Sequence, residues 1–368
     1  MRTLFIVTTA VLVWCNVNQV ALASSNISSL IYNGETTSTG SNGDWPSIAT
    51  LYYDAVDYSG IYSLYCGASI LDSQHVLTAA HCLYDGEGNL NEDYLIYTSV
   101  VPQMEDESEF LDGTVDVIRA SEFYVHSGYI DSSSDDSTSW PNDIAIIKLA
   151  EEMNINSSDY ATRASQTNAI DYRVDGTEFI AVGHGLTETG DEETLLQTTL
   201  EYQSEDYCDF DNLNDSQLCM SGRYDSTTNV RNSTCSGDSG GPLYWDANST
   251  TSDSDSNSNY VQVGITSYGW TGCYNASSDD TSVFTEVTDY ESWITSVLQG
   301  NEAPNYTVTS EDRDQYYYNS VDNDNSDSIS TVDSSSSSGG SLSFYSVILL
   351  TVLIVCRKKV VHKAHLLQ

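Results

Sequence analysis

The sequence predicts an all-β fold, either a sandwich or a barrel, and three observations support this prediction. Over residues 31–300, short apolar runs alternate with polar segments rich in turn-forming residues. Long helical periodicity is missing between these runs, which is typical of β-sandwiches and β-barrels. Only residues 286–298 show a convincing helical pattern, because their large apolar side chains repeat with the spacing of one buried helix face.

The individual elements follow in chain order. The strand-like apolar runs are residues 48–53, 69–78, 144–149, 179–182 and 261–267. The apolar face of the helix consists of Tyr290, Trp293, Ile294, Val297 and Leu298.

Three polar segments are expected to lie outside the core. Residues 131–139 and 246–259 are tracts of Ser, Asp and Asn, which cannot bury enough apolar surface to order themselves. We expect them to be surface insertions. Residues 301–341 end in a run of serines and are expected to form a solvated stalk.

The chain is strongly acidic, with 54 Asp and Glu residues against 12 Lys and Arg residues and a formal net charge of -42 at pH 7. Hydrophobic residues make up 39% of the sequence, which suffices for a packed core, so the acidity does not by itself indicate disorder. A surface of this charge repels phosphate backbones and anionic lipid headgroups. Nucleic acid is therefore excluded as a partner.

The N-terminus has the three regions of a secretory signal peptide, namely Arg2, an apolar run over residues 4–14 and the small residues Ala21 and Ala23 of an Ala-x-Ala site. Cleavage is expected after Ala23, so residues 1–23 form the signal peptide. An uncleaved membrane anchor is the alternative, and the shortness of the apolar run argues against it.

The C-terminus predicts a membrane anchor. Residues 342–356 are apolar, and three basic residues, Arg357, Lys358 and Lys359, follow directly. The positive-inside rule then makes residues 357–368 a cytoplasmic tail and places the acidic bulk outside. The protein is expected at the cell surface as a single-pass type I membrane protein, or extracellular if it is shed. A GPI signal is the alternative, and the basic tail argues against it.

The cysteines agree with an exported protein. Cys15 lies in the predicted signal peptide and Cys356 at the membrane edge, and an even set remains: Cys66, Cys82, Cys208, Cys219, Cys235 and Cys273. Such a set suits disulfides in an oxidising compartment, but spacing alone does not choose among the pairings. N-glycosylation sequons also agree with export through the secretory pathway. They occur at Asn26, Asn156, Asn214, Asn232, Asn248, Asn275 and Asn305.

Three separate segments contain a nucleophile, a base and an orienting acid. Residues 237–242 (GDSGGP) put Ser239 among glycines, which lets backbone N–H groups converge on one point. Residues 78–82 (TAAHC) place His81 beside a cysteine that could fix its position, and residues 142–149 (NDIAIIKL) put Asp143 at the start of an apolar strand. Each string alone would be weak evidence.

Together, in the order His, Asp, Ser, these strings resemble the chymotrypsin-like (trypsin) serine protease family. Further similar strings occur at residues 31–35 (IYNGE), 44–46 (DWP), 65–71 (YCGASIL), 126–129 (HSGY), 183–185 (GHG) and 267–269 (SYG). The resemblance covers most of residues 31–300. It implies two six-stranded antiparallel β-barrels, with the site in the cleft between them, and a C-terminal helix. It also implies the disulfides Cys66–Cys82, Cys208–Cys219 and Cys235–Cys273.

The resemblance assigns roles to five residues. Ser239 would attack the peptide carbonyl, while His81 acts first as base and then as acid. Asp143 would orient His81, and Ser267 would donate a hydrogen bond to Asp143. The N–H groups of Gly237 and Ser239 would form the oxyanion hole.

The resemblance also implies the partners. They would be protein or peptide substrates, with protein protease inhibitors as a further class, and no metal or cofactor is expected. The alternative function is a catalytically inactive homologue that acts as a cell-surface binding protein.

Activation departs from the family pattern. The resemblance implies that cleavage frees the amine of Ile31, which then pairs with Asp238. The preceding residue is Leu30 rather than Arg or Lys, so a trypsin-type activator does not fit residues 24–30, the expected propeptide. Tyr32 also replaces the smaller residue that the family prefers.

The specificity pocket departs as well. Ser233 stands where members specific for Arg or Lys carry Asp at the pocket floor, with Gly269 and Ser282 on the walls. An uncharged slot favours an aromatic or large aliphatic residue before the scissile bond. A carboxylate from Asp279 or Asp280 could restore tryptic specificity instead.

Two further expectations concern calcium and glycans. Residues 85–93 and 105–109 are rich in carboxylates, but residues 85–93 lack the glycine and glutamate of an EF-hand loop, so solvated loops are favoured over calcium sites. Asn232 is expected to be unmodified, because it adjoins the pocket floor. Asn248, in its polar tract, is expected to carry a glycan.

Overall fold

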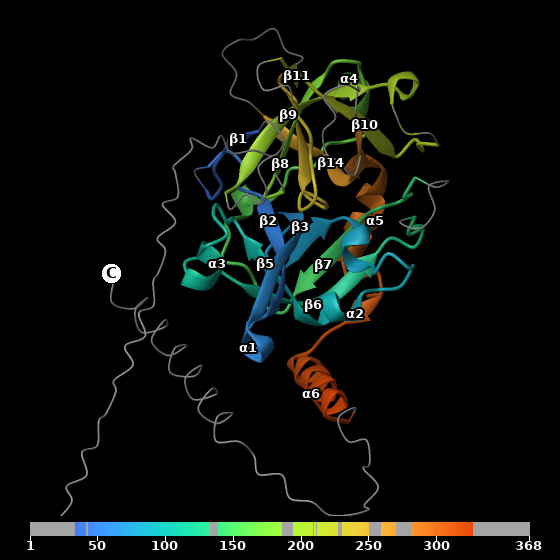
Figure 1. Ribbon diagram of the computed structural model, residues 1–368. Coiled ribbons are helices and arrows are strands. Elements are labelled where there is room, and N and C mark those ends of the chain that lie inside the picture. The colour runs from blue at the N-terminus through green and yellow to red at the C-terminus, as the bar shows by residue number, and fades with distance from the viewer. Residues whose placement is uncertain are drawn as a thin grey trace, which may run out of the picture. The chain divides into compact units, whose positions relative to one another are not determined.

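The computed structural model describes residues 34–41, 43–132, 139–185, 194–208, 210, 212–226, 230–249, 259–269 and 281–326. Within these residues the chain forms two antiparallel β-barrels and a helix after the second one (Figure 1). The expected signal peptide, propeptide, membrane segment and tail lie outside the described residues, as do most of the two expected insertions. Among the residues described, no helix is both long and apolar enough to cross a membrane.

The N-terminal barrel has the strand order β6-β5-β2-β3-β4-β7 and closes by pairing of β6 with β7. Its strand β2 is buried on both faces, which explains its continuous apolar run. Leu51 packs in the barrel core, whereas Tyr52 on the other face packs in a second cluster with Phe110. The strands are β2 (Ile48–Ala55), β3 (Ile61–Ile70), β4 (His75–Thr78), β5 (Thr98–Pro102), β6 (Ile118–Val125) and β7 (Ala145–Leu149).

The C-terminal barrel has the order β9-β10-β15-β14-β13-β8 and closes by pairing of β8 with β9. Its core is aromatic, with Trp245, Phe179 and Phe284 in one cluster. Each barrel therefore has six strands, as expected, and each sheet carries one short additional strand at its edge. The strands are β8 (Glu178–Gly183), β9 (Leu196–Gln203), β10 (Gln217–Gly222), β13 (Pro242–Asp246), β14 (Tyr260–Gly269) and β15 (Thr281–Glu286).

Short elements complete the fold. Strand β1 (Glu35–Thr36) pairs with β9, β16 (Tyr306–Thr307) pairs with β6, and β11 (Tyr224–Asp225) pairs with β12 (Val230–Arg231). The remaining helices and 3₁₀ turns are α1 (Val56–Ser59), η1 (Ala80–Leu83), α2 (Glu92–Tyr97), α3 (Glu109–Asp112), η2 (Ser157–Asp159), α4 (Ala169–Tyr172), η3 (Glu205–Tyr207), η4 (Val287–Tyr290), α5 (Glu291–Leu298) and α6 (Ser310–Ser326).

The helix expected at residues 286–298 is present as the 3₁₀ turn η4 followed by α5, while Glu286 ends strand β15. Its buried residues Ile294 and Val297 pack in the core of the N-terminal barrel, although the helix follows the C-terminal one. Ile265 of β14 joins the same core. The helix thus holds the two barrels together.

Residues 301–317, which we call the C-terminal clasp, differ from the expectation of a solvated stalk. Here β16 pairs with β6, and the Asn305 side chain accepts a hydrogen bond from the backbone of Val125 at 2.8 Å. The side chain of Arg313 is only 6% exposed and donates to the backbone carbonyls of Ile96 and Ala120, at 2.9 and 2.6 Å. Backbone pairing and one buried cation therefore order this segment, although its composition alone predicts no ordered structure.

Candidate active site

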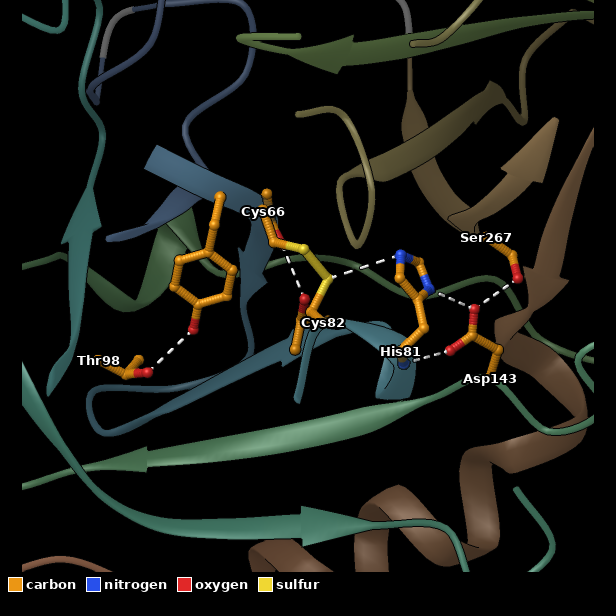
Figure 2. The surroundings of a disulfide bond; sticks show 9 residues. Cys66, His81, Cys82, Thr98, Asp143 and Ser267 are labelled. Carbon is orange, nitrogen blue, oxygen red and sulfur yellow. Dashed lines mark hydrogen bonds and ion pairs between the residues drawn. A yellow bond between two sulfur atoms is a disulfide. The ribbon is translucent and has the colours of Figure 1, made fainter. Parts of the chain in front are cut away.

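The imidazole of His81 is positioned by the turn η1, directly after β4, and Asp143 lies two residues before β7. Nδ1 of His81 lies 2.7 Å from Oδ2 of Asp143, and the backbone N–H of His81 donates to Oδ1 at 2.8 Å. Because β4 and β7 are paired neighbours, their ends bring the two residues together. Figure 2 shows the imidazole between this carboxylate and the Cys66–Cys82 disulfide.

The Asp143 residue is completely buried and is held by hydrogen bonds from both barrels. Ser267 of β14 donates to Oδ2 at 2.5 Å, and Thr285 of β15 donates to the backbone carbonyl of Asp143 at 2.9 Å. These two partners belong to the C-terminal barrel, so Asp143 sits at the junction of the barrels. A carboxylate held in this way fixes the tautomer in which Nδ1 of His81 carries the proton and Nε2 is an acceptor.

Ser239 lies in the turn before β13, beside His81 on the walls of two cavities. Its backbone carbonyl accepts a hydrogen bond from Gly67 of β3 at 2.8 Å, which ties this turn to the N-terminal barrel. Among the described residues no hydrogen bond joins Oγ of Ser239 to His81, and Nε2 lies 3.9 Å from Sγ of Cys82. Nucleophile–base contacts are often loose in structures without substrate.

The turn around Ser239 depends on glycine. Gly237 has a φ of 101°, and a Cβ at this position would lie 3.0 Å from Cα of Gly185. Gly240 has a φ of 78°, which also favours glycine. The positive φ values let this turn present the N–H groups of Gly237 and Ser239, the residues expected to form the oxyanion hole.

Asp238 belongs to the same turn and is 1% exposed. Its carboxylate accepts backbone hydrogen bonds from Gly185 at 2.9 Å and Cys235 at 2.8 Å, and no cationic side chain pairs with it in the described part of the chain. Burial raises the pKa of Asp238 to about 7. A Cβ on Gly183 or Gly185 would lie 2.3 Å from its oxygens, which explains the glycines of the string GHG.

His184 lies between these two glycines, and its burial next to the site was not predicted from the sequence. It is 6% exposed, and Nε2 has no partner among the described residues. Burial lowers its pKa to about 4, although the Glu105 carbonyl and the Asp106 carboxylate favour the proton. Only its place within the string GHG gave a signal.

The first cavity next to Ser239 has a volume of about 340 Å³. Its walls include Thr234 and Cys235 before the nucleophile, Ser267 and Gly269 of β14, and Trp140. Ser282, on β15, is buried directly opposite Gly269 in the sheet.

Ser233 is the residue expected at the pocket floor. It is not among the described residues that line the first cavity, and its hydroxyl donates to the carbonyl of Thr234 at 2.9 Å. The neighbouring Asn232 donates its side-chain amide to the Thr199 carbonyl at 2.9 Å. Asp279 and Asp280 lie outside the described residues.

Trp140 also escaped sequence reasoning. Its ring centroid lies 4.6 Å from that of His81 and 6.0 Å from that of Tyr268, with a backbone φ of 43°. The residue precedes Asp143 by three positions, which was the only available signal. It covers the imidazole on the side of the first cavity.

The disulfides Cys66–Cys82 and Cys208–Cys219 are present. Cys235 is also disulfide-bonded, and its expected partner, Cys273, lies outside the described residues. Within the described residues, the group of three or more His, Cys, Asp or Glu side chains close enough to share an ion is Cys66, His81 and Cys82, and disulfide sulfurs are not thiolate ligands.

Comparisons with known proteins agree with this geometry. The family model described as Trypsin matches residues 31–294. The chain is 30% identical over 255 residues to Brachyurin of Leptuca pugilator, covering 68% of this chain and 92% of that protein. It is 30% identical over 278 residues to chymotrypsin-like elastase family member 1 of Homo sapiens, covering 72% of this chain and 92% of that protein. It is 27% identical over 248 residues to Trypsin alpha of Drosophila melanogaster, covering 65% and 78%.

The paired barrels, the polar network on Asp143 and the glycine-rich turn at Ser239 therefore have the same explanation as these matches: the chain belongs to the trypsin-like serine proteases, peptidase family S1, a family of serine endopeptidases.

Proposed function

We propose that the chain is an active serine endopeptidase that forms an acyl-enzyme on Ser239. The observation that carries the proposal is the Asp143 network, in which a fully buried carboxylate accepts hydrogen bonds from His81 and Ser267. A serine hydroxyl is a poor nucleophile at neutral pH until a base takes its proton. An imidazole with a fixed tautomer beside Ser239 supplies that base.

The reaction follows from these positions. Oγ of Ser239 attacks the peptide carbonyl and gives its proton to Nε2 of His81, while Asp143 stabilises the imidazolium. The N–H groups of Gly237 and Ser239 stabilise the negative oxygen of the tetrahedral intermediate. The intermediate collapses, and the leaving amine takes the proton from His81. Water then repeats the sequence on the ester and releases the acid and the free serine.

The first cavity would hold the side chain before the scissile bond. Apart from His81, its described lining offers hydroxyl groups, backbone and the rings of Trp140 and Tyr268, with no charged side chain. This lining supports an aromatic or large aliphatic preference, which would also permit cleavage after Leu30. Dominant cleavage of a peptide library after Arg or Lys would contradict it and point to Asp279 or Asp280.

Activity would depend on a new N-terminus at Ile31. The buried Asp238 carboxylate, which has backbone donors but no cation among the described residues, supports this dependence. An inserted amine would supply the missing charge and fix the turn from Gly237 to Ser239. Full reaction of the uncleaved chain would refute this proposal.

Residues 342–356 would tether the enzyme to the cell surface. Deletion of residues 342–368 is expected to release the protein into the medium, whereas unchanged membrane retention would contradict the proposal. Resistance of the intact protein to phosphatidylinositol-specific phospholipase would exclude the GPI alternative.

Labelling with a fluorophosphonate probe tests catalytic competence. The cleaved protein is expected to react at Ser239, and Ser239→Ala is expected to abolish labelling. A cleaved, folded protein that does not react would instead favour the alternative, an inactive homologue that acts as a cell-surface binding protein.

A further inference from the structure

A second cavity adjoins Ser239 and is lined mostly by residues of the N-terminal barrel. It has a volume of about 370 Å³ and shares His81, Ser236 and Ser239 with the first cavity. The first cavity would hold the side chain before the scissile bond, and the second cavity reaches the same Ser239 from the residues of the N-terminal barrel. The second cavity therefore receives residues on the leaving-group side, an assignment that rests on the proposed function.

Three tyrosines and a disulfide form much of this cavity. Tyr65, Tyr84 and Tyr94 line it together with Cys66 and Cys82. This lining offers aromatic rings to whichever side chain enters.

Each of the three rings is supported by a neighbour. Tyr65 and Tyr94 meet edge to face with centroids 5.0 Å apart, and Tyr84 meets Tyr129 edge to face at 4.9 Å. The Tyr65 hydroxyl shares a hydrogen bond with Thr98 at 3.0 Å. The rings are thus preorganised, so little ordering free energy opposes binding.

The described lining contains one acidic side chain. Asp85 lies on the cavity wall, and its carboxylate accepts backbone hydrogen bonds from Glu87 at 2.8 Å and Asn89 at 3.1 Å. These donors hold the pKa of Asp85 below its usual value, so the carboxylate is ionised at neutral pH. Asp131 binds the same loop through the N–H of Gly88 at 3.1 Å. None of the described lining residues is Lys or Arg.

We propose that this cavity selects a basic side chain, Arg above Lys, at the first or second residue after the scissile bond. A guanidinium stacks on tyrosine faces and pairs with a carboxylate at the same time, and the walls of the cavity offer both groups. An acidic side chain meets repulsion from Asp85 and Asp131. The enzyme thus combines an apolar preference before the cleaved bond with a basic preference after it.

The test uses the cleaved protein and internally quenched peptides with Tyr before the scissile bond. The residue after the bond is Arg, Lys, Leu, Phe or Glu, at the first or the second position. We expect kcat/KM for Arg to exceed that for Leu by roughly 10-fold, because one cation–π contact and one exposed ion pair together have about this effect. High salt is expected to reduce the ratio.

Two variants assign the effect to the cavity. Asp85→Asn keeps an acceptor for the loop hydrogen bonds but removes the charge, and should reduce the Arg-to-Leu ratio several-fold. Tyr94→Leu should reduce it as well, whereas Tyr94→Phe keeps the ring face and should preserve it. Glu151→Gln, an exposed charge beyond the far end of β7, is the matched control and should change nothing.

A p-nitroanilide substrate with the same acyl part separates the two proposals, because it has no residue after the scissile bond. If neither the p-nitroanilide nor the peptides are cleaved, the proposed function fails. The inference is overturned if the p-nitroanilide is cleaved but kcat/KM of the Leu or Phe peptide equals that of the Arg peptide. It is also overturned if Asp85→Asn leaves the Arg-to-Leu ratio of kcat/KM unchanged.

Discussion

Two buried carboxylates lie close to the nucleophile, and their surroundings differ. Asp143 is bound by two side chains, His81 and Ser267, the first of which can take a positive charge during catalysis. Asp238 has two backbone donors and, within the described residues, no cationic partner. The fold thus gives Asp143 side-chain partners from both barrels, whereas the described part of the chain places only backbone donors at Asp238. Under the proposed function, this difference would make the His81–Asp143 geometry intrinsic to the fold and activation dependent on cleavage.

The largest expected effect is the loss of kcat on substitution of Asp143. Asn at position 143 can still accept the hydrogen bond from the His81 backbone, but it can also donate to Nδ1 and so favour the wrong tautomer. Asp143→Asn should lower kcat by about 10⁴-fold, which is the typical loss when the acid of a Ser-His-Asp triad becomes an amide. Steady-state kinetics on the cleaved protein measure this, and a loss below about 10-fold would contradict the assigned role.

Asp238→Asn should change the pH dependence of stability in the uncleaved chain. The pKa of Asp238 is raised from 3.8 to about 7 in the folded state, so between these values the folded protein holds a proton that the unfolded chain has lost. The free energy of unfolding therefore falls as pH rises from about 4 to about 7, by roughly 4 kcal/mol for this group. Denaturant unfolding across this range should show that the variant lacks this decrease.

The cleaved wild-type protein is the control for Asp238. If the Ile31 amine pairs with the carboxylate, the decrease should also disappear after cleavage. Persistence of the decrease in both the cleaved protein and the variant would show that Asp238 does not cause it.

His184 should give the free energy of unfolding the opposite pH dependence. Its pKa is lowered from 6.5 to about 4, so the unfolded chain binds a proton before the folded protein does. Stability should therefore fall as pH decreases from about 6.5 to about 4, by roughly 3 kcal/mol. His184→Phe should remove this loss in the same denaturant series, and an unchanged slope would contradict the assignment.

The smallest expected effect is a loss of thermal stability on substitution of Arg313, a buried cation. Arg313→Ala should leave the carbonyls of Ile96 and Ala120 without these donors, at a cost of about 2 kcal/mol, which corresponds to a Tm lower by roughly 5 °C. Differential scanning calorimetry measures the shift. Arg223→Ala is the control, because Arg223 is 67% exposed and should matter little. Equal shifts would mean that the clasp adds no stability through Arg313.

Local sequence patterns predicted much of the fold. The runs that became β2, β7, β8 and β14 are apolar because neighbouring elements cover them, and helix α5 shows its buried face as a repeat. The residues at the centre of the site were also found, because the strings around His81, Asp143 and Ser239 need particular residues at fixed positions.

The clasp shows where such patterns fail. Nothing in the local composition around Asn305 or Arg313 indicates burial, because their partners lie 180 residues and 193 or more residues away in the sequence. Hydrogen bonds of this range exist only after β6 and α2 have formed.

Residue type and short-range order were enough to predict an all-β fold and, through the resemblance of short strings, the family, its two barrels and the candidate reacting groups. The side chains that surround those groups became visible in the folded chain alone. Trp140 reaches His81 from a backbone with positive φ, Tyr65 and Tyr94 meet across two elements, and His184 is buried near Glu105 and Asp106, far away in the sequence. The physical reason is that burial, pKa and cavity shape are properties of long-range packing, which the order of residues along one strand does not contain.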